Sequence, residues 1–529
     1  MCAGYKMKPN KQPVSHSIAF LAAVFLALFL FLSRPASFET LIWKFPRWVD
    51  LQEEDSSVTV EEIKTLLDNY QQFAIQEVAI QEVKDTLETA AGVATEIAGD
   101  SSHADTSLPV KIVSVEDESY GREDAANVLH PDLLLQGNER AFERLASFFS
   151  KLNAPVRSPS LHVFHFGDSQ IEGDRITGVL RSKWQETWGG SGPGFLAPAQ
   201  PIPSLSMKQE WSSDWKRFTR FGKVDSTIEH NRYGMFAAFA QHDNSKGETS
   251  PWIRFTPHPR SFKRNQVFDQ IHLVLGRTDT ASSVTLELNN DTLKSFQLKV
   301  DSLHSTLVIP IPQDSAAVRS FEALKISFEG NSPEFHAVGL WSQSGIVVHN
   351  AAMRGSSGTL FRQLNRAQLT AQLRSVRTEM IMLQYGGNAV PYLKDSASIR
   401  RFGGWFASQI RLFQAILPEV PIVVIGPSDM CEKRGTRMQT YRMLPFVRDV
   451  MKSITMQENA LYWDVFEVMG GPGSMAAWVE SSPALASPDH VHFTPQGARE
   501  IANLFNKSLQ TEWALWQAWQ ADLTLSDAL

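Results

Sequence analysis

The sequence predicts an α/β protein whose parallel sheet is interrupted by an inserted antiparallel β-domain. Strand-like apolar runs alternate with amphipathic helical segments at residues 161–184 and again from about residue 341 onward. This alternation is typical of a parallel sheet covered by helices on both faces. Between these regions, residues 201–340 lose helical periodicity and show short apolar or alternating runs separated by turn signals, which indicates a β-sandwich.

The α/β part is expected to contain about five strands that alternate with helices along the chain. The expected strands cover residues 163–166, 345–349, 380–383, 421–425 and 461–465. The expected helices cover residues 141–152, 360–373, 399–417, 440–454 and 495–516, with a further helical segment after the turn at residue 169, in which Ile176, Val179, Leu180 and Trp184 have helical spacing. Strands of the β-domain are expected at residues 252–255, 270–275, 283–288, 306–309 and 323–328. Ligands of parallel sheets bind where the strands end, so polar residues directly after these strands are candidate site residues.

The composition is that of an ordinary globular protein and excludes several functions. Of the 529 residues, 43% are hydrophobic and 20% are charged, and the formal net charge is −7. Because no dense group of Lys and Arg interleaves with aromatic residues, nucleic acid is not expected as a partner. Cys2 precedes the apolar N-terminal segment and Cys431 lies far after it, so neither an intrachain disulfide nor a cysteine-ligated zinc site is expected.

The N-terminus has the pattern of a segment that inserts into a membrane. Lys6, Lys8 and Lys11 precede an unbroken apolar run at residues 18–32, and this order predicts an N-terminus in the cytoplasm. The run is short for a membrane span, so a cleaved signal peptide and an uncleaved anchor both fit. Because no clean small-residue cleavage site appears before Arg34, the pattern favours an anchor, and either interpretation predicts that the rest of the chain is exported.

Composition and periodicity divide the chain into successive parts. The tryptophans in or beside the β-domain, which are Trp211, Trp215, Trp252 and Trp341, suit core packing or alternatively stacking on sugars. The expected parts are a membrane anchor or signal segment (1–35), an acidic and partly helical or disordered spacer (36–129), the first part of the α/β domain (130–200), the inserted β-domain (201–340), the second part of the α/β domain (341–517) and a C-terminal tail (518–529).

A candidate nucleophile follows the first expected strand. In LHVFHFGDSQIEGDR, residues 161–175, an apolar run breaks at Gly167-Asp168-Ser169 and helical periodicity follows. A strand that runs into a helix through a tight turn would hold Ser169 at a helix N-terminus, where backbone N–H groups and the helix dipole favour developing negative charge. Ser169 is therefore a candidate nucleophile. The alternative is that it only caps the helix, as serine commonly does.

A candidate base lies near the C-terminus. Asp489 and His492 are three positions apart in the turn before a helix that is expected to begin at Thr494-Pro495. At this spacing the carboxylate can reach Nδ1 of the histidine, fix its tautomer and leave Nε2 free as a base. His490 ranks second because adjacent side chains point apart in an extended chain. The alternative is a loop histidine beside a capping aspartate.

Two turns could supply hydrogen-bond donors to a developing oxyanion. Asn388 follows two glycines at the end of a strand and could offer its amide, and Gly355 in a glycine-rich turn could offer its backbone N–H. Each turn is ordinary on its own. Their combination is much less common than any one of these turns, because each candidate lies at a strand end or a loop–helix junction. In chain order the candidates are Ser169, Gly355, Asn388 and the Asp489–His492 pair.

This order of motifs resembles the four sequence blocks of the SGNH, or GDSL-type, hydrolase family. The resemblance covers roughly residues 130–200 and 341–515 and implies a three-layer, flavodoxin-like fold with a parallel sheet. Gln170 stands where the family has leucine, and Ala389 stands where an acid is common, and neither position is expected to carry chemistry. The matching motifs are Gly167-Asp168-Ser169, Gly355, Gly386-x-Asn388 and Asp489-x-x-His492.

The resemblance also implies the roles of the site residues. Ser169 would be the nucleophile of a serine esterase, His492 its general base and Asp489 the acid that orients the base. The backbone N–H groups of Ser169 and Gly355 and the side chain of Asn388 would form the oxyanion hole. Neither a metal nor another cofactor is expected.

The long separation between Ser169 and Gly355 implies that the β-domain is inserted into the hydrolase domain. An exported SGNH protein with such an insertion most resembles the bacterial peptidoglycan O-acetylesterases, in which the inserted module resembles a carbohydrate-binding domain. The resemblance implies removal of O-acetyl groups from a cell-envelope polysaccharide, with peptidoglycan as the expected substrate. It also implies a single-pass inner-membrane protein with a periplasmic catalytic domain, or a periplasmic protein if the N-terminal segment is cleaved. The alternatives are an O-acetyltransferase on the same glycan, a non-catalytic glycan-binding protein and a lipid acyl esterase.

Overall fold

A computed structural model describes six stretches of the chain. The expected membrane segment and spacer lie outside them. Among the described residues, no helix is both long and apolar enough to cross a membrane. The described stretches are residues 134–155, 158–243, 250–278, 281–300, 305–311 and 321–526, with side chains described up to residue 521.

The α/β part is built on a five-stranded sheet in which all neighbouring strands pair in parallel. The strand order is β13-β1-β14-β15-β18, which is 2-1-3-4-5 when this sheet is numbered along the chain and is the order of flavodoxin-like folds. This confirms the predicted fold class. The strands are β1 (Leu161–Gly167), β13 (Ile346–Ala352), β14 (Thr378–Gln384), β15 (Ile422–Ile425) and β18 (Leu461–Trp463).

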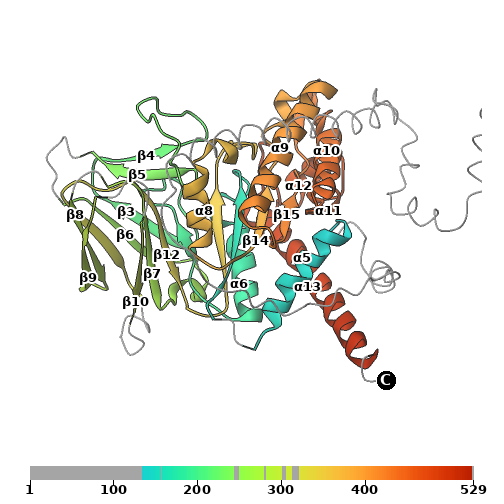
Figure 1. Cartoon of the computed structure of the whole chain (residues 1–529). Helices are drawn as coiled ribbons and strands as arrows, with labels where there is room; N and C mark the ends of the chain where they lie inside the picture. The colour runs from blue at the N-terminus through green and yellow to red at the C-terminus, as the bar shows by residue number, and fades with distance from the viewer. Residues whose placement is uncertain are drawn as a thin grey trace, which may run out of the picture. The chain divides into compact units, whose positions relative to one another are not determined.

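Helices cover both faces of this sheet (Figure 1). On one face, Val163 of β1 and Val348 of β13 share a buried cluster with Leu180 of α6 and Phe505 of α13. On the other face, Phe166 of β1 packs against Phe413 of α9, with ring centroids 5.3 Å apart. Side chains along β1 point alternately to the two faces of the sheet, so this strand packs against the helices on both sides. The described α-helices are α5 (Glu139–Asn153), α6 (Thr177–Trp188), α8 (Arg366–Arg374), α9 (Ser396–Ile416), α10 (Leu444–Gln457), α11 (Val465–Val468), α12 (Ser474–Glu480) and α13 (Pro495–Ser526).

Two helices that follow the insert in the chain begin later than expected, for local reasons. The helix expected at residues 360–373 is split, because the side chain of Asn365 accepts a hydrogen bond from the backbone N–H of Gln368 and caps α8 at that point. The helix expected at residues 440–454 begins at Leu444 instead. Thr440 pairs with Cys431 in a hairpin that the sequence did not indicate, formed by β16 (Cys431–Arg434) and β17 (Arg437–Thr440).

The inserted part is a β-sandwich of two antiparallel sheets, as predicted. In β11, Leu324 and Ile326 are fully buried whereas Lys325 and Ser327 are not, so alternation places one face of the strand in the core. One sheet contains β10 (Ser305–Pro310), β7 (Gln270–Leu275), β12 (Phe335–Trp341), β5 (Ala238–His242), β4 (Trp215–Thr219) and β2 (Gly194–Leu196). The other contains β3 (Met207–Trp211), β6 (Trp252–Pro257), β11 (Leu324–Glu329), β8 (Ser282–Leu288) and β9 (Asp291–Leu298).

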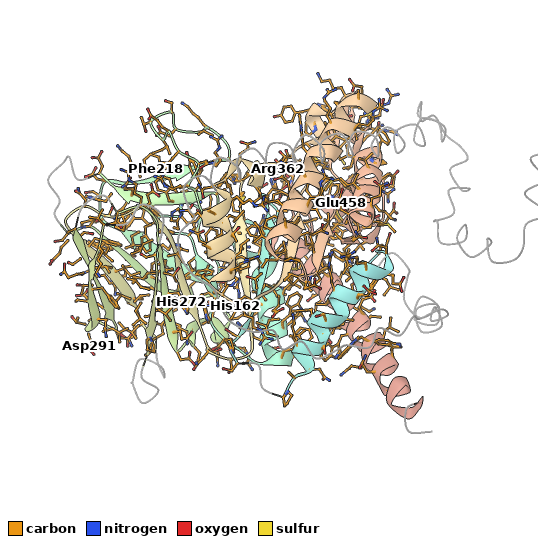
Figure 2. All side chains as sticks on the ribbon, in the orientation of Figure 1. His162, Phe218, His272, Asp291, Arg362 and Glu458 are labelled. Atoms are coloured by element: carbon orange, nitrogen blue, oxygen red, sulfur yellow. The ribbon has the colours of Figure 1, made fainter. Side chains whose placement is uncertain are left out.

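The tryptophans of the sandwich mostly pack inside the protein. Trp211 and Trp215 pack against the sandwich core, and Trp341 is 1% exposed. Figure 2 labels His162 and His272 in the region where the sandwich meets the α/β part. The ring of Trp341 lies between them, stacked on His272 at 4.0 Å and edge-on to His162 at 5.0 Å between centroids. The core-packing interpretation therefore holds for these residues.

A chain of buried histidines joins the sandwich to the parallel sheet. The backbone N–H of Phe195 in β2 donates to Nδ1 of His349 at 2.9 Å, so the proton of His349 is on Nε2 and points to Nδ1 of His162, also 2.9 Å away. Nε2 of His162 then donates to Ser160 Oγ at 3.0 Å. Burial lowers the pKa of His162 to about 3 and that of His349 well below its ordinary value. His162 and His349 are therefore both neutral over the physiological pH range, and their hydrogen bonds hold the two parts together.

Candidate active site

Ser169 lies in the loop after β1, at the carboxyl edge of the parallel sheet. Its side chain is almost buried. The expectation that Ser169 lies at a helix N-terminus is wrong. A short 3-10 turn at Glu172–Asp174 intervenes, α6 begins only at Thr177, and Ile176 occupies its N-cap position. Ser169 is therefore neither a helix cap nor a residue at a helix N-terminus, and the helix-dipole argument for its reactivity does not apply.

The structure brings Ser169, His492 and Asp489 into one hydrogen-bonded row. Ser169 Oγ lies 2.8 Å from Nε2 of His492, and Nδ1 of His492 lies 2.8 Å from Oδ2 of Asp489. Because an ionised carboxylate only accepts, Nδ1 carries the proton and the lone pair of Nε2 faces the serine hydroxyl. Among the described residues, the Ser169 hydroxyl pairs with His492, whereas Nδ1 of His490, the second candidate base, is buried without a hydrogen-bond partner.

Asp489 is held in its ionised form. Partial burial would raise its pKa, but hydrogen bonds to the carboxylate outweigh burial and leave the pKa below its ordinary value. These bonds come from the backbone N–H groups of Val491 and His492, both at 3.0 Å, and from the His492 ring. The loop thus folds around its own aspartate and presents one histidine to Ser169.

The expected oxyanion-hole residues lie beside Ser169. The N–H of Met353 donates to the carbonyl of Gly167 at 2.7 Å, so the turn that contains Gly355 lies against the Ser169 loop. Gly355 has φ of 77°, a left-handed conformation, and no atom lies within 4 Å of the place where a Cβ would be. Its surroundings are therefore open to a ligand.

The side chain of Asn388 also lies against the serine loop, but its amide group is already hydrogen-bonded. Its Nδ2 donates to Oδ2 of Asp168 at 2.8 Å and to the carbonyl of Ser356 at 3.2 Å. An amide nitrogen has two protons, and both are engaged. Donation to an oxyanion therefore requires one bond to be shared or released, and the longer bond to Ser356 is the weaker of the two.

Gln170 holds the histidine loop, a role that its departure from the family pattern did not suggest. Its Nε2 donates to the carbonyl of Val491 at 2.7 Å, and its Oε1 accepts from the N–H of Phe493 at 3.4 Å. These residues flank His492 in the chain. A leucine could make neither bond, so Gln170 is a positioning residue for His492.

Arg175 adds a second brace that sequence reasoning missed. Its guanidinium donates to the carbonyl of Ser169 at 2.9 Å, to that of Phe493 at 2.8 Å and to that of Glu172 at 3.0 Å. One side chain thereby joins the serine loop to the histidine loop. No signal in the sequence links them, because Arg175 and Phe493 are 318 residues apart.

Replacing Gln170 by leucine is expected to lower kcat for p-nitrophenyl acetate about 10-fold, because His492 loses a hydrogen-bonded brace worth roughly one buried hydrogen bond. The melting temperature should hardly change, which distinguishes positioning from general destabilisation. Gln439→Leu, at an exposed glutamine of β17, is the matched control. An unchanged kcat in Gln170→Leu would show that the brace does not matter.

Asp168 is the one buried carboxylate in direct contact with an expected oxyanion donor among the described residues. Burial raises its pKa to about 6, although hydrogen bonds from Gln170 and Asn388 act against the rise. The folded protein therefore binds more protons than the unfolded chain between about pH 4 and 6. Since the pKa is raised, the free energy of unfolding must fall as pH rises through this window.

We expect the wild type to lose about 2 kcal/mol of stability between pH 4 and pH 7 as Asp168 ionises, from the difference between pKa 3.8 and about 6. Asp168→Asn cannot ionise and lacks this change. Urea unfolding of both proteins at the two pH values measures it, since other titrating groups cancel in the comparison. A difference between the two proteins that is the same at both pH values would contradict the assignment.

A pocket with a volume of about 230 Å³ opens beside Ser169. Its lining includes Asp168, Ser169 and Asn388, and three tyrosines, Tyr385, Tyr392 and Tyr441. Tyr392 is 79% exposed, so its ring stands at the rim. In the described part of the chain, no group of three or more His, Cys, Asp or Glu side chains is arranged to hold a metal ion.

The chain is similar to known proteins in structure, but comparisons of its sequence find no match. No protein-family model matches the chain, and no curated protein matches it significantly. A solved peptidoglycan O-acetylesterase is similar, with a TM-score of 0.54 and 19% identity over 72% of this chain and 99% of that chain. The acetylxylan esterase Axe2 from Geobacillus stearothermophilus also matches, with a TM-score of 0.23 and 20% identity over 32% of this chain and 75% of that chain. The esterase EstA from a Pseudoalteromonas species matches with a TM-score of 0.24 and 15% identity over 32% of this chain and 79% of that chain.

The first of these likenesses agrees with the features found in the molecule itself. The sheet has flavodoxin-like order, and Ser169, Asn388 and His492 meet at its carboxyl edge. An antiparallel sandwich separates the two halves of the sheet in the sequence. The chain therefore has the fold of the SGNH, or GDSL-type, hydrolases.

Proposed function

We propose that the protein is a serine esterase that removes O-acetyl groups from a cell-envelope polysaccharide, with peptidoglycan as the first candidate. The observation that carries the proposal is the row of hydrogen bonds from Ser169 Oγ through His492 to Asp489, both 2.8 Å long. A hydroxyl that faces an oriented imidazole is the arrangement that nucleophilic acyl transfer requires.

In the first step, Ser169 Oγ attacks the acetyl carbonyl while Nε2 of His492 takes the hydroxyl proton. Asp489 stabilises the imidazolium that forms. The carbonyl oxygen becomes an oxyanion, which the N–H groups of Ser169, Gly355 and Asn388 stabilise, each by about 2–4 kcal/mol. The oxyanion collapses, His492 returns the proton to the sugar oxygen, and the deacetylated glycan leaves.

In the second step, water replaces the sugar. His492 takes a proton from the water as its oxygen attacks the acetyl-Ser169 carbonyl, and the same donors hold the second oxyanion. Collapse breaks the bond to Ser169 Oγ, which recovers its proton from His492. Acetate is released and the enzyme is restored.

The shape of the pocket supports a small acyl group on a larger polar body. A volume of about 230 Å³ accommodates acetyl more readily than a long acyl chain. The exposed ring of Tyr392 at the rim offers a stacking surface for a sugar. The similar solved protein is a peptidoglycan O-acetylesterase, which supports an acetylated glycan as the substrate class.

Replacing Tyr392 by alanine is expected to lower kcat/KM for O-acetylated peptidoglycan about 10-fold, since a stacking contact of roughly this size is lost. Hydrolysis of p-nitrophenyl acetate, which has no sugar to stack, should change little. Tyr392→Phe keeps the ring and is the matched control. Equal losses on both substrates would argue against a sugar platform.

Acetate release from O-acetylated peptidoglycan, measured with the full chain and with Ser169→Ala, tests the function itself. The expected result is release by the wild type alone. Acetylated xylan serves as a second glycan, and a clear preference for it would contradict the choice of peptidoglycan. Transfer of acetyl to an added glycan without release of acetate would instead make the protein a transferase.

The basic flank and apolar run at residues 1–32 support a location in the inner membrane with the catalytic part in the periplasm. Fractionation of cells, with protease added to spheroplasts, tests this. The proposed location requires membrane-bound protein that the external protease digests. Protein protected from the protease would contradict it.

A further inference from the structure

We propose that Gln384 is a further substrate-binding residue, whose side-chain amide donates a hydrogen bond to an uncharged oxygen of the sugar that carries the acetyl ester. The inference rests on the proposed function, since it concerns the substrate of the Ser169 site. Gln384 is the last residue of β14, and it pairs in parallel register with Gly167 of β1, two positions before Ser169. It therefore lies at the same edge of the sheet as the candidate nucleophile.

Gln384 is almost completely buried, yet it lines the pocket beside Ser169. The residue is 4% exposed. Among the described residues, the one hydrogen bond of its side chain joins Oε1 to Nε2 of His165, 3.0 Å away. Nε2 of Gln384 has no partner there but is not sealed from solvent, in contrast to the unpaired Nε2 of Gln372. Because the rest of the residue is buried, the pocket is the route by which a ligand reaches this nitrogen.

A chain of hydrogen bonds fixes which end of the amide is left for the pocket. Nδ2 of Asn350 donates to the carbonyl of Ile171 at 2.9 Å and to Oγ1 of Thr177 at 2.7 Å. The Thr177 hydroxyl then donates to Nδ1 of His165 at 3.0 Å. Burial lowers the pKa of His165 to about 3, so the ring is neutral and its one proton lies on Nε2. That proton points to Oε1 of Gln384, which leaves the N–H2 group for a ligand.

The free end of the amide favours an oxygen that accepts hydrogen bonds and carries no charge. A desolvated N–H group without a partner is costly, so an acceptor in the pocket is stabilising. The described residues that line the pocket include no Lys, Arg or His, and their one carboxylate is that of Asp168. Asp168 would repel a carboxylate on the ligand once its own side chain ionises, whereas a hydroxyl or an amide carbonyl is not repelled.

The position of Gln384 separates it from the expected oxyanion donors. Gly355 belongs to the turn after β13, and β13 lies on the other side of β1 from β14. Asn388 reaches toward that turn, because its Nδ2 donates to the carbonyl of Ser356. Gly355 is not among the described residues that line the pocket. Gln384 is therefore assigned to a part of the substrate other than the reacting carbonyl, which is the sugar.

Two sugar esters and one aryl ester test this role. The sugar esters are methyl 6-O-acetyl-β-D-glucopyranoside, which has a hydroxyl at C2, and its 2-acetamido-2-deoxy analogue. The aryl ester is p-nitrophenyl acetate, which has no sugar. For each full-length protein, kcat/KM for a sugar ester is divided by kcat/KM for p-nitrophenyl acetate. This ratio does not depend on the fraction of the protein that is folded.

Three variants are compared with the wild type. Gln384→Met keeps the length of the side chain but removes the amide. Thr177→Val keeps the shape of the side chain but removes the hydroxyl that fixes the proton of His165, so the Gln384 amide is free to turn over. Gln372→Met is the matched control, because Gln372 is fully buried and is not among the described residues that line the pocket. Its Oε1 accepts from the N–H of Met235 at 2.7 Å, and its Nε2 is unpaired.

We expect the ratio for one or both sugar esters to fall about 10-fold in Gln384→Met and about 3-fold in Thr177→Val, and to keep its wild-type value in Gln372→Met. A fall for the acetamido sugar alone identifies the amide carbonyl as the acceptor. A fall for the glucoside alone identifies its C2 hydroxyl, and a fall for both identifies a hydroxyl that the two sugars share.

An unchanged ratio in Gln384→Met overturns the role, and an unchanged ratio in Thr177→Val does so if Gln384→Met does not fold. An equal fall in Gln372→Met overturns it in favour of a general effect of removing buried amides. Cleavage of p-nitrophenyl acetate alone by the wild type overturns the role while the Ser169 esterase stands. Failure of the wild type to cleave any of the three esters overturns the proposed function, and this role with it.

Discussion

Ser169→Ala is expected to lower kcat for p-nitrophenyl acetate by about 1,000-fold or more. The variant keeps His492, Asp489 and the oxyanion donors, but no atom remains to form the acyl-enzyme. The loss should appear in kcat rather than KM, because the alanine leaves the pocket open. Initial rates at saturating ester measure it.

Ser428→Ala is the matched control for this experiment. Ser428 lines the same pocket and is also buried, but its nearest hydrogen-bond partner is Gln170, at 3.4 Å, rather than a histidine. Its removal should change kcat by less than about 10-fold. Comparable losses in the two variants would show that the effect reflects packing of the pocket and not a nucleophile.

Arg181→Met is expected to lower the free energy of unfolding by about 3–5 kcal/mol, because it leaves a buried carboxylate without its partner. Arg181 and Asp174 are 1% and 4% exposed and share two hydrogen bonds, at 2.6 and 3.0 Å. Arg181 also donates to the carbonyl of Val348 in β13 at 2.6 Å, and Ser206 of the insert donates to Asp174. One ion pair thus joins the serine loop, the sheet and the insert. Urea unfolding measures the change.

Lys216→Met is the control for Arg181→Met. Lys216 pairs with Asp243 at 2.8 Å, but the two side chains are 60% and 25% exposed, so the loss should stay below about 1 kcal/mol. The double variant Asp174→Asn/Arg181→Met should be less destabilised than Arg181→Met alone, because no unpaired charge remains. Equal destabilisation of these two proteins would mean that packing, not the buried charge, sets the cost.

The sequence was sufficient to predict the parallel sheet and the residues that meet around Ser169. Continuous apolar runs mark β14 and β15, and a run broken only by His162 and His165 marks β1, because parallel strands are buried on both faces. The Asp489–His492 pair could be predicted because the two residues are only three positions apart in one turn, so local geometry alone brings them together. Ser169 and Asn388 could be placed because parallel strands end at one edge of a sheet.

Other parts could not be predicted, for physical reasons. Gln170 and Arg175 act through contacts with residues more than 300 positions away, which leave no local pattern. Strands β3 and β4 were missed because they are short, mostly polar and only partly buried. The gap between Ser169 and α6 was missed because apolar residues after the serine continue the helical spacing while Gly173 and Asp174 adopt left-handed φ angles of 70° and 63°.

The role of the inserted sandwich also needed the structure. Its tryptophans left a sugar-binding surface open as the alternative to core packing, and Trp211, Trp215 and Trp341 pack inward. The exposed aromatic residue at the pocket is Tyr392, which belongs to the α/β part. What the sandwich brings to the serine loop is Ser206, just before β3, which donates a hydrogen bond to Asp174. Such a contribution depends on how the insert packs against the serine loop, and periodicity does not report it.

Covalent labelling with diethyl p-nitrophenyl phosphate tests most directly whether Ser169 is the nucleophile. Its hydroxyl oxygen would displace p-nitrophenolate from phosphorus and keep the diethylphosphoryl group. Intact-mass measurement should find one such group per chain, peptide mapping should place it on Ser169, and His492→Gln should react far more slowly. Loss of esterase activity with the label on another residue, or full activity in protein labelled on Ser169, would contradict a Ser169–His492–Asp489 esterase.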